Sequence, residues 1–237
     1  MDLAANYHDL LARVEAACAR AQRAPSDILF LPVSKGHSPE MIMRAADLGL
    51  TVFGESKVQE ARSKKPLCSS RLQWHMIGHL QSNKCRDAVQ LFQMIQSVDS
   101  LELAQELNKW AEKLGRRMAI LLEVNVAGEA TKYGFSPSQL LQSLAEINEL
   151  PRLEIHGLMT IAPYSPDPER SRPFFQKLRD LREQCSDQLG APLPHLSMGM
   201  SGDFEVAIEE GATIIRIGTA LFGARSTLNR KPTAAGA

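Results

Sequence analysis

The residue best suited to covalent chemistry is a lysine at the end of an apolar run. Residues 28–33 are apolar, and Ser34 and Lys35 follow them directly. A lysine at the end of a buried strand can lose its proton, because a low dielectric disfavours the ammonium form. The neutral amine can then form a Schiff base with an aldehyde. The alternative for Lys35 is a solvated loop lysine, the usual situation of this residue type.

A second stretch, near the C-terminal end, suits the binding of a phosphate. Small and hydroxyl residues form two turns, one with Ser201 and one with Gly218 and Thr219. Backbone N–H groups in such turns bind phosphate, although two ordinary turns are the alternative. Met200 precedes the first turn, and we place it at the same site, although a methionine there also suits packing. An aldehyde that also carries a phosphate is pyridoxal 5'-phosphate, PLP.

One arginine interrupts an apolar run close to the second turn. Arg216 lies within residues 214–217, which are otherwise isoleucine. A charge inside a buried strand needs a partner, which would be either a structural salt bridge or a ligand. His75 and His79 are four residues apart across a glycine, and no H-E-x-x-H motif is present. We therefore expect no zinc site.

Composition excludes several classes of protein. The chain has 237 residues and a formal net charge of zero, whereas nucleic-acid binders usually carry a basic surplus. The N-terminus lacks the basic and apolar regions of a signal peptide, and no apolar stretch has the length of a membrane span. Four scattered cysteines contain no C-x-x-C pair, so we expect neither disulfides nor a metal site. A reduced cytoplasm is the expected compartment.

The hydrophobic pattern alternates between strands and helices along the whole chain. Such alternation predicts a parallel sheet, and about eight units predict a single (β/α)8 barrel preceded by an extra N-terminal helix. An open doubly wound sheet is the alternative, although no G-x-G-x-x-G follows the first strand. We expect the barrel to occupy residues 1–224 and a flexible tail to occupy residues 225–237. The expected strands are residues 28–33, 51–53, 72–77, 94–98, 118–126, 153–160, 195–198 and 212–217, and the expected helices are 7–22, 38–49, 56–65, 81–90, 100–114, 136–150, 168–189 and 202–210.

This arrangement gathers the polar residues at one end of the barrel. In barrels of this type the loops that follow the strands hold the active site. Lys35, Ser201 and Thr219 all follow predicted strands, and so does Lys132 after the fifth strand. The pattern therefore places the amine and the two turns around one opening.

Several motifs, in the same order, resemble those of the YggS/PROSC family of pyridoxal phosphate homeostasis proteins. The resemblance extends from Tyr7 to Gly223. Two positions depart from the family pattern: Ser56 replaces a usual asparagine, and Gly202 replaces a usual polar residue. The motifs are Val33-Ser34-Lys35, Phe53-Gly54-Glu55, Val58-Gln59-Glu60, the run from Trp74 to Lys84, the run from His156 to Thr160, the run from Leu196 to Ser201, and the run from Arg216 to Gly223.

The resemblance implies a fold and a set of cofactor-binding residues. The family fold is a single PLP-binding barrel, similar to the barrel domain of alanine racemase. Lys35 is implied to be the Schiff-base lysine, and Arg216 is implied to face the pyridine nitrogen. Lys132 is implied to lie at the outer edge of the cofactor, with a solvated loop lysine as the alternative. The residues implied to hold the phosphate are Ser201, Gly218 and Thr219.

Residue types at the implied site favour a PLP holder over an enzyme. Most PLP enzymes keep the pyridine nitrogen protonated with an acidic residue, whereas arginine only donates hydrogen bonds. None of the tyrosines, Tyr7, Tyr133 and Tyr164, lies in a motif of the racemase catalytic tyrosine. We therefore expect a monomeric cytoplasmic protein that holds PLP as a lysine aldimine and delivers it to apo PLP enzymes. The alternatives are a small PLP-dependent racemase and, less favoured, a Schiff-base aldolase.

Overall fold

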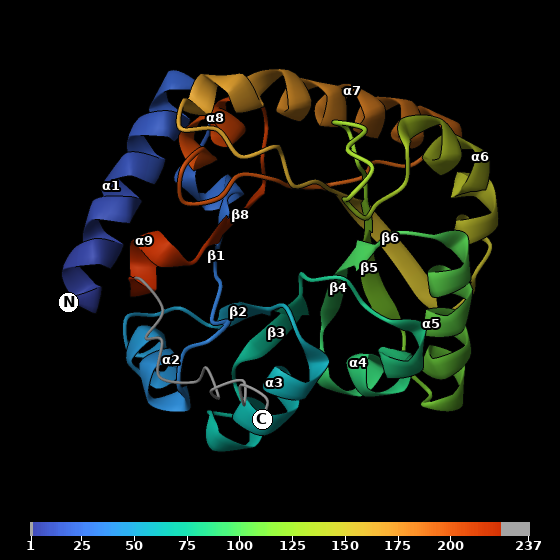
Figure 1. The fold of residues 1–237 in the computed structure, drawn as a ribbon, viewed down its shortest axis with the longest axis horizontal. Helices are drawn as coiled ribbons and strands as arrows, with labels where there is room; N and C mark the ends of the chain where they lie inside the picture. Colours follow the sequence, from blue (N-terminus) through green and yellow to red (C-terminus); the bar gives the residue numbers. More distant parts are fainter. Residues whose placement is uncertain (1, 224–237) are drawn as a thin grey trace, which may run out of the picture.

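Eight parallel strands form a ring with helices on its outside (Figure 1). The computed structural model describes residues 2–223. This architecture confirms the predicted (β/α)8 barrel and its additional N-terminal helix. The predicted tail, residues 225–237, lies outside the described residues. The strands are β1 Leu29–Pro32, β2 Val52–Glu55, β3 Gln73–Met76, β4 Met94–Val98, β5 Met118–Glu123, β6 Leu153–Met159, β7 His195–Ser197 and β8 Ile214–Ile217.

Several helices begin where the sequence supplies caps for unpaired backbone N–H groups. The side chains of Asp2, Ser100 and Ser136 accept hydrogen bonds from the first turns of three helices. Ser136 also forms a capping box with Gln139. The helices are α1 Leu3–Arg20, α2 Pro39–Ala46, α3 Val58–Lys64, α4 Cys85–Leu91, α5 Leu101–Lys113, α6 Pro137–Asn148, α7 Arg172–Leu189, α8 Phe204–Glu209 and α9 Thr219–Phe222.

Three helices begin about four residues from the predicted position, each for a local reason. Helix α1 begins at Leu3 rather than residue 7, because Asp2 caps it. Helices α4 and α7 begin later than predicted, because 3-10 turns at Ser82–Lys84 and Pro168–Ser171 precede them. Helix α9 was not predicted, since its four residues are too few to show a period.

The sheet runs in the order β1-β8-β7-β6-β5-β4-β3-β2. It closes between β1 and β2 through a parallel bridge from Val33 to Gly54. The backbone N–H of Ser34 also donates to the carbonyl of Gly54 at 3.0 Å. The seam that closes the barrel therefore lies directly before Lys35.

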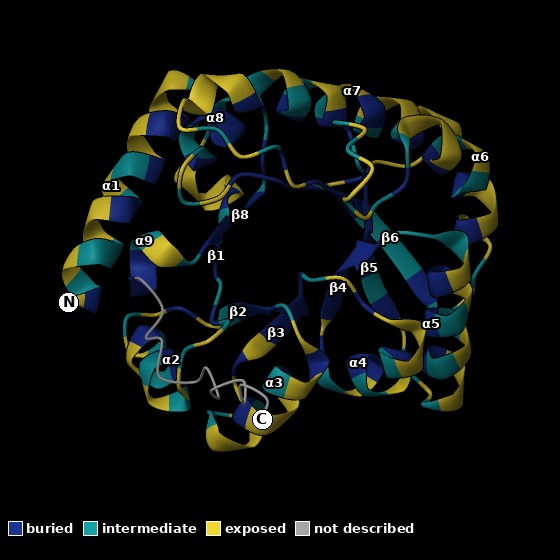
Figure 2. Ribbon diagram, in the orientation of Figure 1, coloured by how far each residue is buried: buried dark blue, intermediate teal, exposed yellow. Residues whose placement is uncertain are grey.

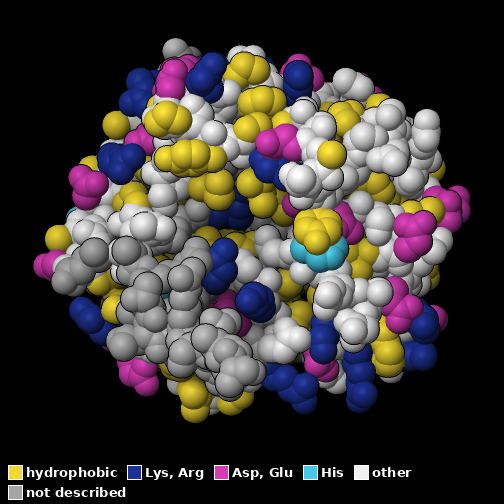
Figure 3. All heavy atoms as spheres, viewed as in Figure 1, with side chains coloured by type: hydrophobic (Ala, Val, Ile, Leu, Met, Phe, Trp, Pro, Cys, Tyr) yellow, Lys and Arg dark blue, Asp and Glu magenta, His cyan; other side chains and the backbone are white. Residues whose placement is uncertain are grey.

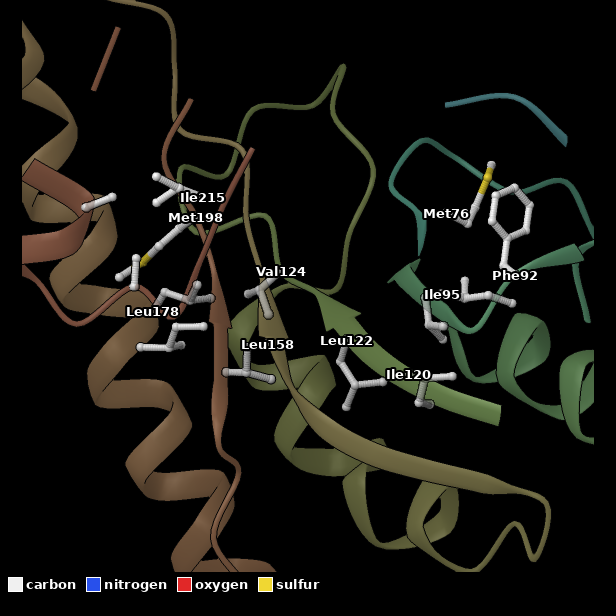
Figure 4. Close-up of a cluster of buried hydrophobic side chains, with 14 of the residues drawn as sticks. Met76, Phe92, Ile95, Ile120, Leu122, Val124, Leu158, Leu178, Met198 and Ile215 are labelled. Carbon is white, nitrogen blue, oxygen red and sulfur yellow. The ribbon is translucent and has the colours of Figure 1, made fainter. Parts of the chain in front are cut away.

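Two apolar cores hold the barrel together. The larger core lies between the strands and the helices, where residues such as Leu158 on β6 and Leu178 on α7 are fully buried (Figure 4). The smaller core fills the barrel interior and includes Leu31, Met94 and Leu121. Figure 2 shows that the strands are largely buried and that most exposed residues lie on the outward faces of the helices and in loops. Within residues 2–223 we find no helix with the length and apolarity that a bilayer crossing requires.

Candidate functional site

One cavity at the carboxyl end of the barrel gathers most of the predicted site residues. Its volume is about 330 Å³, within the usual range of small-molecule sites. Figure 3 shows the hollow at the centre of this face, with Lys and Arg side chains in and around it. Six of the seven predicted residues line the cavity, namely Lys35, Met200, Ser201, Arg216, Gly218 and Thr219.

The amine enters this cavity from the end of β1. Leu31 and Ser34 are fully buried, whereas Lys35 is partly buried in the cavity wall. Ser56, which replaces the usual family asparagine, lines the same cavity from the end of β2. The structure thus places the sequence-predicted nucleophile in a concave site.

The two predicted phosphate turns lie against each other. The backbone N–H of Ala220 donates to Ser201 Oγ at 3.3 Å, which joins the loop after β7 to the start of α9. None of the hydrogen bonds found among residues 2–223 uses the backbone N–H groups of Ser201, Gly202, Gly218 or Thr219. Such groups, facing a cavity, are suited to an anion.

A carboxylate also lines the cavity, but its oxygens are already engaged. Asp203 Oδ1 accepts from the backbone N–H of Met200 at 2.7 Å. Its Oδ2 accepts from Ser171 Oγ at 2.9 Å. Through these hydrogen bonds, Asp203 stabilises the turn that contains Ser201.

Arg216 forms the inner wall of the cavity and is hydrogen-bonded to neutral groups. Its Nη1 donates to Ser197 Oγ at 2.7 Å, and its Nη2 donates to the carbonyl of Thr160 at 2.8 Å. No ion pair to Arg216 is found within residues 2–223, so the alternative of a structural salt bridge is not what the structure shows. Burial lowers the pKa of Arg216 to about 10, which leaves it cationic at neutral pH.

The interior network beneath Arg216 was not found from the sequence. Ser197 Oγ donates to Gln96 Oε1 at 2.6 Å, which crosses the barrel from β7 to β4. Gln96 Nε2 lies 3.0 Å from His75 Nδ1. Burial, with a smaller contribution from His195, lowers the pKa of His75 to about 4, so this imidazole is neutral at neutral pH. No motif signals such a network, because its members come from different strands.

A buried carboxyl group lies near the arginine at the end of β5. The side chain of Glu123 is 7% exposed. Burial, reinforced by the nearby charge of Asp99 and opposed by Arg216, raises the pKa of Glu123 to about 7. Glu123 is therefore poised to change its charge near neutral pH.

Lys132 lies beside the main cavity rather than in its wall. It forms an ion pair with Glu129, and its Nζ lies 3.4 Å from the carbonyl of Ile161. It lines a separate cavity of about 140 Å³ together with Glu123 and Tyr133. Because Ile161 lines both cavities, they are neighbours. The role of Lys132 at the outer edge of a cofactor stays a prediction.

A third cavity, of about 510 Å³, adjoins the main one on the β2 and β3 side. Lys35 and Ser56 line both cavities, and His79 lines the third. His79 Nδ1 lies 2.8 Å from Asp99 Oδ2, and its ring stacks on Tyr133 with 3.6 Å between centroids.

The described residues contain no cluster of side chains able to hold a metal ion.

Comparison with known proteins decides the family. The model of the alanine racemase N-terminal domain matches residues 11–226. The pyridoxal phosphate homeostasis protein of Aquifex aeolicus is 47% identical over 217 residues, which cover 91% of this chain and 95% of that protein. This chain belongs to the family of pyridoxal phosphate homeostasis proteins. The family predicted from the sequence motifs is confirmed.

Solved structures agree with this assignment. The structure of PipY from Synechococcus elongatus with PLP bound has a TM-score of 0.79 and 38% identity, and the match covers 90% of this chain and 99% of that one. Alanine racemase from Clostridium difficile shares the fold at a TM-score of 0.71 with 19% identity. The match covers 93% of this chain but 56% of the racemase, so the racemase has a large region outside the shared barrel.

Proposed function

We propose that this protein binds PLP in the main cavity, attached covalently to Lys35, and serves PLP homeostasis inside the cell. The observation that carries the proposal is the composition of one cavity wall. It combines an amine on one side with two adjacent turns that offer backbone N–H groups on the other. A phosphorylated aldehyde needs both features. The PLP-bound structure of a relative, PipY, supports this cofactor.

Each side chain of the cavity has a role in this proposal. Lys35 Nζ would hold the aldehyde carbon, with loss of water, and Ser201, Gly218 and Thr219 would hold the phosphate. Arg216 donates toward the pyridine nitrogen, while Met200 packs at the opening, where it is 38% exposed. PLP supplies an electron-withdrawing ring, and a permanently charged donor at its nitrogen leaves that nitrogen unprotonated and weakens this chemistry. The residues therefore favour holding the cofactor over turning over a substrate.

The cellular setting is part of the same proposal. The four cysteines are thiols in the structure, and Cys18, Cys85 and Cys185 are buried, which supports a reducing cytoplasm. We also propose that the protein works as a monomer and releases PLP to apo forms of PLP-dependent enzymes. The exposed position of Tyr164 beside the cavity supports an opening that solvent and a recipient can reach.

Borohydride reduction of the purified protein tests the covalent site. Loaded with PLP, the protein should absorb visible light, and reduction should leave a pyridoxyl mass on the peptide that contains Lys35. Lys132→Ala is the matched control, because it removes a neighbouring lysine outside the main cavity and should leave the label in place. A label found only on Lys132 would refute the assignment of Lys35. A colourless protein that accepts a sugar phosphate would instead support the aldolase alternative.

A further inference from the structure

The peptide that carries Lys35 lies at the seam where the barrel closes. Strands β1 and β2 meet there through the bridge from Val33 to Gly54. Beyond this bridge, the backbone N–H of Ser34 donates to the carbonyl of Gly54 at 3.0 Å, and Ser34 Oγ makes a longer contact of 3.4 Å with the same oxygen. The position of Lys35 therefore depends on the groups that hold the ends of β1 and β2 together.

A buried ammonium group joins the two strand ends to helix α3. Lys64 is 7% exposed, and its Nζ donates to the carbonyl of Ser34 at 2.7 Å. The same Nζ donates to Glu55 Oε1 at 2.7 Å and to Glu60 Oε1 at 2.5 Å. Since an ammonium has three hydrogens, all its donors are used. One group thus connects the end of β1, the end of β2 and the first turn of α3.

The two carboxyl groups bind the residues on both sides of Lys35, one through a backbone N–H and the other through a side-chain hydroxyl. Glu60 Oε1 accepts from the backbone N–H of Gly36 at 2.6 Å. Glu55 Oε1 accepts from Ser34 Oγ at 2.8 Å. Gly36 has a φ of 78°, a conformation that side chains rarely adopt, so the chain turns sharply at the residue after the lysine. The residues before and after Lys35 are therefore both hydrogen-bonded to the same cluster.

Burying these charges is costly unless each has a partner. Glu55 is fully buried, and desolvation raises the pKa of its carboxyl group against the opposing effect of Lys64. Lys64 Nζ contacts both Glu55 and Glu60, so each carboxyl group has a cationic partner. Because buried ion pairs are often no more stabilising than apolar side chains of similar volume, the cluster is weak evidence for a role in stability alone.

We propose that Glu55, Glu60 and Lys64, named here the clasp, are positioning residues that hold Lys35 in the geometry required to retain PLP. They act through the backbone of Ser34 and Gly36 across the β1–β2 seam. This inference rests on the proposed function, because it assigns the clasp to the lysine that binds the cofactor. Loss of the clasp should loosen the Lys35 peptide more than it unfolds the barrel.

Substitution of Glu60 is the sharpest test, because its side chain is 21% exposed and tolerates change better than Lys64. Glu60→Ala removes the acceptor of the Gly36 N–H and one of the acceptors of Lys64, and should speed PLP release about tenfold. Glu60→Gln keeps an acceptor oxygen for Gly36 and should restore part of the retention. The release rate is followed by absorbance of the bound cofactor after dilution.

A control variant on the same helix separates an effect on the position of Lys35 from a general loss of protein stability. Arg62 on α3 pairs with Asp87 at the surface, with 70% of its side chain exposed, so Arg62→Ala should release PLP at the wild-type rate. Hydrogen exchange of the peptide with Ser34 and Gly36 should accelerate in Glu60→Ala and not in Arg62→Ala. Lys64→Met removes the ammonium that joins the two strand ends, and it should also speed PLP release. If this variant does not fold, the Glu60 variants provide the test.

Two outcomes would overturn the proposal in different ways. If Glu60→Ala lowers the unfolding temperature of the apo protein but releases PLP within about twofold of wild type, the clasp is structural only. If the wild-type protein itself carries no reduced label on Lys35, the proposed function fails and the clasp loses its purpose. Labelling of the wild type therefore tells the two failures apart.

Discussion

Arg216 is a buried cation in the last strand of the barrel. The residue is 4% exposed, and its guanidinium donates to Ser197 and to the backbone of Thr160. The sequence predicted its importance from the interruption of an apolar run. It could not predict the bonding partners, since Thr160 and Ser197 come from the ends of other strands.

Arg216→Ala should weaken PLP binding without unfolding the barrel. Loss of the donor to the ring should cost about 1–3 kcal/mol of binding free energy, measured by equilibrium titration with PLP. Arg216→Lys keeps the charge but loses the paired donors of the guanidinium. Its affinity for PLP should therefore lie between those of the wild type and of Arg216→Ala. Unchanged affinity, together with a large loss of apo-protein stability, would show that Arg216 serves the fold instead.

Glu123 should make the stability of the apo protein depend on pH. Its pKa is about 7 in the folded protein, above its ordinary value of 4.5. The folded state therefore binds the proton more tightly, and this stabilisation is complete below pH 4.5 and is lost as pH rises through 7. Relative to Glu123→Gln, the wild type should lose about 1–3 kcal/mol of unfolding free energy between pH 5 and pH 8.

Urea unfolding of both proteins at several pH values gives the comparison. The amide of Glu123→Gln does not titrate, so the variant controls for all other groups, including the neutral His75. If the unfolding free energies of the two proteins change in parallel from acid to alkaline pH, the raised pKa of Glu123 is contradicted.

At the scale of elements, short segments rich in apolar residues located every strand. β1 and β5 show this most clearly, and polar residues follow several strand ends on the same rim. The clasp was beyond prediction, although Glu55 and Glu60 lay in recognised motifs. In the sequence, Lys64 is indistinguishable from an ordinary basic residue in the last turn of a helix, here α3. Only the packing of α3 against the β1–β2 seam shows that it is buried.

The contact between the β2 and β3 loops gives a prediction at this scale. A Cβ on Gly78 would lie 2.4 Å from the carbonyl oxygen of Ser56, a backbone atom that cannot rotate away. Because Ser56 lines the main cavity, Gly78→Ala should lower both the unfolding temperature and PLP retention. Gly202→Ala is the matched control, since a Cβ there meets nothing within 4 Å and the backbone N–H remains. Equal unfolding temperatures for the two variants would contradict this close approach.

The whole molecule is a barrel whose cavity opens to solvent within the described residues. Several exposed apolar side chains, including Ile161, Tyr164 and Met200, line the main cavity. Access of water favours exchange of a bound aldehyde and disfavours carbanion chemistry, which depends on a dry site. The architecture therefore agrees with a holder of PLP.

The choice between a carrier and an enzyme can be measured directly. PLP-loaded protein mixed with an apo PLP enzyme should restore the activity of that enzyme, and the Lys35→Ala variant, which cannot hold the aldehyde, should restore less. In the same preparations, racemisation and α-proton exchange of common L-amino acids should stay near the rate given by PLP alone, because an arginine at the ring nitrogen, as proposed for Arg216, would weaken the electron sink. Turnover of any amino acid at about 1 per second or faster, abolished by Lys35→Ala, would instead make the protein a racemase.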